Sequence, residues 1–149
     1  MRRARVYIAI GFAAFVFLGI SGLLARALTG AGTERSHVLE LLQAQASGDT
    51  AAVLDKLTAC RAQPACAEVV RARVGELARE GDVEILTYTP SVQVSLTTRS
   101  GVGRVAWRAG RSAPVVQCVR VRREGPLTGA DVELLAISAP IGGEESCPA

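Results

Sequence analysis

The chain has 149 residues, 49% of them hydrophobic, and a formal net charge of +3. That charge comes from the N-terminus, where Arg2, Arg3, Arg5 and Arg26 supply four of the seventeen basic side chains. The other thirteen basic side chains stand against fourteen acidic ones, which leaves the rest of the chain at −1. Nucleic-acid-binding domains usually carry a strong basic excess, so the composition argues against nucleic acid as a partner.

An uncharged apolar run occupies residues 6–25. As a helix it would be roughly 30 Å long, which matches the hydrocarbon thickness of a bilayer. Arginines are denser before the run than after it, which favours a cytoplasmic N-terminus. We therefore predict that residues 1–28 are a basic start and a transmembrane signal-anchor, and that the protein is a single-pass cell-membrane protein with its C-terminal domain outside. The alternative is a signal peptide cleaved at residues 25–27, which would release a secreted domain.

All four cysteines, Cys60, Cys66, Cys118 and Cys147, follow the apolar run. An even number of cysteines in an exported domain favours structural disulfides, with three possible connectivities. Proximity in sequence favours Cys60–Cys66 and Cys118–Cys147, although it does not exclude the other pairings. A zinc site is the rival interpretation, but the first spacing is wrong for one and the single histidine, His37, is remote. We predict no metal.

Residues 29–35 are expected to be a short linker, and residues 36–140 a single extracytoplasmic domain. The domain should open with three short helices: one that starts at Ser36 and ends at Gly48, one over residues 51–60, and one over residues 64–78. Apolar side chains recur at helical spacing in the first of these, which predicts that one side of it is buried.

After residue 82 the hydrophobic period changes from helical to two. Five strands are expected, over residues 83–89, 92–98, 102–109, 115–123 and 131–138. Short connections require antiparallel neighbours. The fold class is thus α+β, with a transmembrane helix followed by three short helices on a curved antiparallel sheet of about five strands. The polar tail, residues 141–149, should be tethered by Cys147.

The strand alternation gathers four arginines, Arg104, Arg108, Arg120 and Arg122, on the sheet face opposite the helices, and we expect Arg123 to belong to the same basic patch. The simplest interpretation is a face that keeps the domain soluble in water. The functional interpretation is a docking face for an acidic partner, anionic lipid headgroups or an envelope polymer.

Sequence signatures of catalysis are missing. We find no G-x-S-x-G elbow, no phosphate-binding loop and no G-x-G-x-x-G fingerprint, and no cysteine is flanked by a base. We therefore predict no catalytic residue, no cofactor and no enzymatic activity.

The element order and the link Ser47-Gly48-Asp49-Thr50 carry one resemblance. Three helices before a curved sheet, with a "GD" turn between the first two helices, resemble the NTF2-like (cystatin-like) superfold of membrane-anchored actinobacterial envelope proteins. The resemblance implies a concave sheet that can enclose a cavity. Its ketosteroid-isomerase-like enzymes need an acid and a base inside that cavity, and no residue of this sequence matches those roles.

These observations favour a single-span envelope protein whose outer domain is a non-catalytic binding module for an envelope protein or another anionic partner. One alternative is a small-ligand carrier or degenerate NTF2-like enzyme that uses the concave cavity. Another is a structural subunit of an envelope or secretion assembly. A polar cavity would favour the carrier, whereas a filled core with an exposed arginine face would favour the binding module. Neither the partner nor the oligomeric state follows from the sequence.

Overall fold

The computed structural model describes the backbone of residues 2–90, 98–124 and 131–148. Side chains are described for residues 10–22, 32–90, 100–123 and 131–148. The chain divides into two compact units, Met1–Gly32 and Thr33–Ala149. Helix α1 (Arg2–Ala46) extends through both units. Its residues up to Gly32 belong to the first unit, and its residues from Thr33 on belong to the second.

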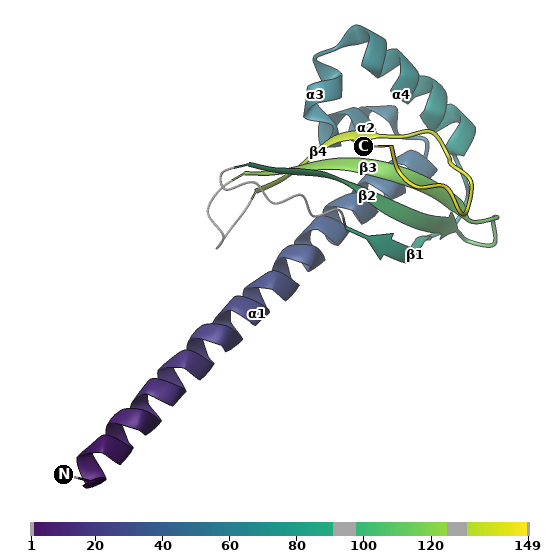
Figure 1. The fold of residues 1–149 in the computed structure, drawn as a ribbon. Helices are drawn as coiled ribbons and strands as arrows, with labels where there is room; N and C mark the ends of the chain where they lie inside the picture. The colour runs from purple at the N-terminus through teal and green to yellow at the C-terminus, as the bar shows by residue number, and fades with distance from the viewer. Residues whose placement is uncertain (1, 91–97, 125–130, 149) are drawn as a thin grey trace. The chain divides into compact units, whose positions relative to one another are not determined.

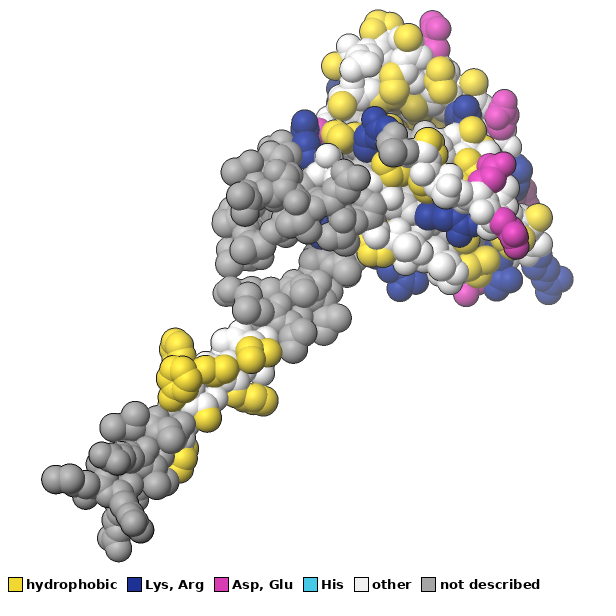
Figure 2. Space-filling model, viewed as in Figure 1, with side chains coloured by type: hydrophobic (Ala, Val, Ile, Leu, Met, Phe, Trp, Pro, Cys, Tyr) yellow, Lys and Arg dark blue, Asp and Glu magenta, His cyan; other side chains and the backbone are white. Residues whose placement is uncertain are grey.

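The prediction of a transmembrane helix is wrong for the part of the chain that is described. Over those residues, no helix combines the length and the apolar character needed to cross a membrane. The predicted span covers residues 6–25, and its side chains are described only over residues 10–22. Within it, Phe12, Phe15 and Phe17 are largely exposed. Figure 2 shows hydrophobic side chains, in yellow, on the described part of the first unit.

The expected linker over residues 29–35 is helical instead, because α1 runs through Gly30 and Gly32 to Ala46. Ser36 therefore lies inside a helix and is not an N-cap. A glycine in a helix interior costs about 1 kcal/mol relative to alanine. Burial of the following turns of α1 in the second unit outweighs that cost, since packing rather than propensity supplies most of a helix's stability.

Three short helices follow α1: α2 (Thr50–Lys56), α3 (Thr58–Arg61) and α4 (Pro64–Leu77). Their boundaries follow local sequence signals. Gly48 adopts a φ of 77° just beyond the end of α1, and the Asp49 side chain caps α2 by accepting a hydrogen bond from Ala52 N at 3.0 Å. Pro64 stands in the first turn of α4, where its missing N–H costs nothing. The segment expected as one helix over residues 51–60 is divided between α2 and α3 at Leu57.

The described sheet has four antiparallel strands in the order β1-β2-β3-β4 (Figure 1). They are β1 (Val83–Thr89), β2 (Thr98–Ala109), β3 (Val115–Glu124) and β4 (Asp131–Ile137). The α+β class and the antiparallel order are those that the sequence predicts, but the count of about five strands is wrong. Strand β1 pairs directly with β2, from Val83↔Ala109 to Thr89↔Arg104, so no strand lies between them. The predicted strand 92–98 falls on residues outside the described part, except for Thr98, which begins β2.

One close backbone approach fixes the entry to the sheet. Gly81, just before β1, has a φ of 104°, and a Cβ placed on it would lie 2.8 Å from Gly110 Cα. Gly110 itself has a φ of 52° and directly follows β2. Only glycine fits such a contact without displacing backbone, so this pair sets how the end of α4 connects to the sheet.

The core of the second unit lies between the helices and one face of the sheet, which we call the inner face. Its fully buried apolar side chains come from every layer: Val38, Leu41 and Leu42 of α1, Val53 of α2, Leu57, Val74 of α4, and Val105, Trp107 and Val119 of the sheet. The apolar stripe that the sequence predicts for the end of α1 is thus the stripe that meets the sheet.

Replacing Leu41 by alanine should destabilise the domain by about 2–5 kcal/mol, because it deletes a fully buried side chain at the junction of α1 and the sheet. Urea unfolding followed by the fluorescence of Trp107 measures this. The matched control is Val69→Ala on α4, where the side chain is 55% exposed and the cost should stay below about 0.5 kcal/mol. Equal midpoints for the two variants would show that α1 does not pack into the core.

Candidate functional site

The strand register places the four predicted arginines on one face of the sheet. Arg104 is opposite Cys118, and Arg120 is opposite Val102 on one side and Ala136 on the other. Alternate residues of a strand share a face, so Arg108 and Arg122 lie on this side as well. It is the side away from Trp107 and Val119, and we call it the outer face.

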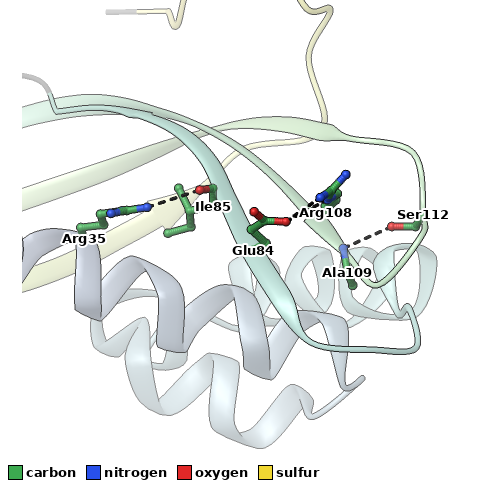
Figure 3. Close-up of polar contacts among 6 residues, drawn as sticks. All are labelled: Arg35, Glu84, Ile85, Arg108, Ala109 and Ser112. Carbon is green, nitrogen blue, oxygen red and sulfur yellow. Dashed lines mark hydrogen bonds and ion pairs between the residues drawn. The ribbon is translucent and has the colours of Figure 1, made fainter.

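Arg108 is paired within the domain. Its Nε and Nη2 both donate to Glu84 Oε2, at 3.0 and 2.7 Å, across the β1–β2 pair (Figure 3). Both side chains are substantially exposed, so this ion pair adds little to stability. Its consequence is electrostatic: an arginine predicted to attract an acidic partner already has a carboxylate beside it.

Arg122 is paired too, with Glu133 on β4, through Nε at 3.1 Å and Nη2 at 2.5 Å. The other oxygen of Glu133 accepts a hydrogen bond from Thr58 Oγ1 at 2.8 Å, which links α3 to the sheet edge. Hydrogen bonds from Arg122 and Thr58 lower the pKa of Glu133, since both favour the ionised carboxylate. This contact therefore has a structural role.

Arg104 holds the C-terminal tail. Its Nε donates to Glu145 O at 3.2 Å, and its Nη2 donates to Gly143 O. The acceptors are neutral carbonyls, so the positive charge of Arg104 is not cancelled, but two of its donors are occupied.

Arg120 differs from the other three arginines. It is exposed, and within the described residues it has no hydrogen-bond or ion-pair partner. Figure 2 shows basic and acidic side chains interspersed on the visible side of the second unit. The predicted patch of four similar arginines is thus one unpaired arginine, one that contacts the tail and two with carboxylate partners.

A fifth arginine, Arg123, lies on the inner face, because it has the strand parity of Val121. Its Nε donates to Glu34 Oε2 at 2.9 Å, its Nη2 contacts the same oxygen, and the hydroxyl of Tyr88 donates to Glu34 Oε1. Glu34 is only 1% exposed. Burial, and then the hydrogen bond to Glu34, raise the pKa of Tyr88, so its hydroxyl remains a donor.

The sequence does not predict this Glu34–Tyr88–Arg123 cluster, because the expected linker contains Glu34 and the expected outer patch contains Arg123, which the structure places on the inner face. One signal was available: Arg123 follows the alternation that buries Val119 and Val121. Each oxygen of Glu34 has a hydrogen-bond partner from the protein, so the cluster ties α1 to β1 and β3.

A second polar group lies deeper in the core. Gln117 Oε1 accepts from Trp107 Nε1 at 2.8 Å and from Gln45 Nε2 at 3.0 Å, and Gln117 Nε2 donates to Ser138 O at 2.9 Å. Gln45 Oε1 has no hydrogen-bond partner among the described residues. The side chains of Gln45, Trp107 and Gln117 are buried, and these hydrogen bonds fix the orientation of Trp107 against α1.

The four cysteines form two disulfides, Cys60–Cys66 and Cys118–Cys147, with Cα–Cα distances of 5.2 and 5.7 Å. The pairing that sequence proximity favours is confirmed. Cys60–Cys66 joins α3 to α4, and Cys118–Cys147 fastens the tail to β3. Among the described residues, no group of three or more His, Cys, Asp or Glu side chains is arranged to hold a metal ion.

Comparisons with family models, curated proteins and solved structures find no match to this chain. The resemblance to NTF2-like domains therefore stays a prediction. The site has to be interpreted from its own geometry.

Replacing Glu34 by glutamine should destabilise the domain by about 3 kcal/mol, because it leaves Arg123 without its counter-charge in a largely buried place. Chemical denaturation measures the loss. Glu40→Gln is the matched control on the same helix, since Glu40 pairs with Lys56 on the surface and should have little effect. If the two variants are equally stable, Glu34 is not a buried ion-pair partner.

Stability should depend on pH through Glu133. Its lowered pKa means that the pair with Arg122 stabilises the fold above the ordinary carboxyl pKa, and that this contribution is lost as the pH falls through the lowered value. We expect wild type to exceed Glu133→Gln in stability near pH 7, and the gap to close below roughly pH 4. Urea midpoints measured across this range test the expectation, and a gap that does not change with pH would contradict it.

Proposed function

We propose that the unit Thr33–Ala149 is a non-catalytic interaction module that binds an acidic protein partner through the outer face of its sheet. The observation that carries the proposal is the filled inner face. Trp107, Val105 and Val119 have no exposed surface there, and they pack against Leu41 and Leu42.

A carrier or an enzyme of the predicted fold would use the inner face differently. It would need a cavity lined by polar groups, with titratable side chains free to act on a ligand. Among the described residues, Glu34 of α1 meets Tyr88 and Arg123 of this face, and these titratable groups are bonded to one another. The amides of Gln45 and Gln117 hold Trp107 in place. This geometry favours binding at the surface over chemistry in the interior.

Arg120 is the centre of the proposed docking face. Its neighbours across the strands, Val102 and Ala136, are half-buried, so it stands on a surface of small apolar groups. A cation above partly exposed apolar surface suits a protein segment that offers a carboxylate and some apolar contact. Arg108 and Arg122 are paired with carboxylates, which reduces their attraction for an anion. Two donors of Arg104 are occupied by tail carbonyls, so in the described part of the chain Arg120 is the arginine of this face with its donors free to bind an anionic group.

The two disulfides support export as part of the same proposal. Such bonds persist in oxidising compartments and are rare where glutathione and thioredoxin keep thiols reduced. A small domain with a short tail gains stability from them, and the outer face would meet its partner outside the cytosol.

The test is a nuclear magnetic resonance titration of the labelled protein with a glutamate-rich decapeptide. We expect amide shifts at Val102, Arg120 and Ala136, and Arg120→Ser should weaken binding roughly twofold to fivefold, an effect that salt suppresses. Arg111→Ser is the matched control, because Arg111 is exposed and unpartnered in the described structure but lies in the β2–β3 turn. Equal losses in both variants would show general charge attraction and overturn the assignment of the face.

A further inference from the structure

The chain beyond β4 first continues along β3 and then returns over the outer face. Ser138 N donates to Cys118 O and Ile141 N donates to Val116 O, each at 2.8 Å, so the chain first continues along β3. It then turns, with Glu145 N donating to Gly142 O at 3.1 Å, and comes back so that Cys147 reaches Cys118. We call residues 139–148 the C-terminal strap; it is the yellow end of the ribbon in Figure 1.

Apart from the backbone that joins it to β4, the disulfide is the only covalent bond between the strap and the sheet, and few apolar contacts add to it. Residues 142–146 are exposed, as is Pro148, and only Ala139, Ile141 and Cys147 are half-buried. With so little apolar surface in contact, the return half of the strap depends on the covalent bond to Cys118 and on the two hydrogen bonds from Arg104. Without the disulfide, chain entropy favours its release.

Two features of the outer face are covered by the strap. Cys118 is 4% exposed, although it stands on the solvent side of the sheet. Arg104 donates two hydrogen bonds to carbonyl oxygens of the strap. Arg104 is opposite Cys118, and Arg120 is two residues further along β3. The two arginines are therefore diagonal neighbours on adjacent strands, a relation in which the two backbone positions are about 7–8 Å apart.

We propose that the C-terminal strap is a redox-sensitive latch that controls the proposed docking face. While Cys118–Cys147 is intact, the strap covers Cys118 and occupies Arg104. When the bond is reduced, the strap leaves, and Arg104 joins Arg120 to form a two-arginine site for carboxylates of an acidic partner. This inference rests on the proposed function, because it assumes that the outer face is the one that binds.

The opening step is thiol–disulfide exchange with a protein or small-molecule dithiol. A thiolate of the dithiol attacks Sγ of Cys147, the more exposed of the two cysteines, and Cys118 leaves as the thiolate. The second thiol of the reductant then displaces Cys147. The reductant ends as a disulfide, and the protein gains two electrons and two protons as two thiols.

The other disulfide does not have this property. Cys60–Cys66 links residues only six apart, and the helices on both sides, α3 and α4, keep their own contacts with the core. Its reduction frees no segment, and it lies away from Arg104 and Arg120 in the chain. It therefore provides the internal control.

The experiment compares the full chain as Cys118→Ser/Cys147→Ser with Cys60→Ser/Cys66→Ser, each titrated with the glutamate-rich decapeptide. We expect the first variant to bind roughly fivefold more tightly than wild type and the second to bind as wild type does. Adding Arg104→Ser to the first variant should remove the gain. Limited proteolysis should cut residues 142–146 only in the first variant.

Dithiothreitol provides a second route that avoids replacing the buried Cys118. In the Cys60→Ser/Cys66→Ser protein it reduces the latch alone, and affinity for the peptide should rise by the same factor. Equal affinities before and after reduction, with the strap shown to be released, would overturn the latch. Loss of the Arg120→Ser effect in the oxidised protein would instead overturn the proposed function, so the two failures are distinguishable.

Discussion

The contact between the last turns of α1 and the inner face of the sheet is the constraint on which the rest of the second unit depends. Val38, Leu41 and Leu42 are fully buried against Val105, Trp107 and Val119. The short helices α2 to α4 have few residues to bury by themselves. They complete a core whose two principal layers are already the end of α1 and the sheet. Burial of such a surface is what outweighs the conformational entropy lost by a small domain.

Polar interactions then select one arrangement of those layers. An apolar stripe alone permits α1 to rotate or slide on the sheet, since dispersion contacts have little directionality. The carboxylate of Glu34 requires Tyr88 and Arg123 to be in place, and the amide of Gln45 requires Gln117. A shift of one residue would leave these buried groups unsatisfied, which is costly. The polar groups of the inner face thus specify geometry.

The features that could be predicted from the sequence are those determined by residues close together in the chain. Local signals were reliable: the Gly48-Asp49 boundary, the first turn of α4 at Pro64 and the two nearest-neighbour disulfides. Strand parity also placed Arg104 and Arg120 on the outer face. What failed depended on distant partners. Nothing near Gly30 and Gly32 shows that α1 continues, because the stabilising contacts come from strands far along the chain.

The candidate site shows the same division. Alternation predicts the face of an arginine but not its partner, so Arg108 and Arg120 look alike in sequence and differ in the structure, where Glu84 pairs with only the first. The tail shows it more strongly. The sequence predicts a polar segment tethered by Cys147. In the structure, carbonyl oxygens of this segment also accept hydrogen bonds from Arg104, which precedes Gly143 by 39 residues. A segment that looks like a loose end is thereby placed over the one face of the sheet that its helices leave open, and its single covalent attachment becomes the element that decides how much of that face is available.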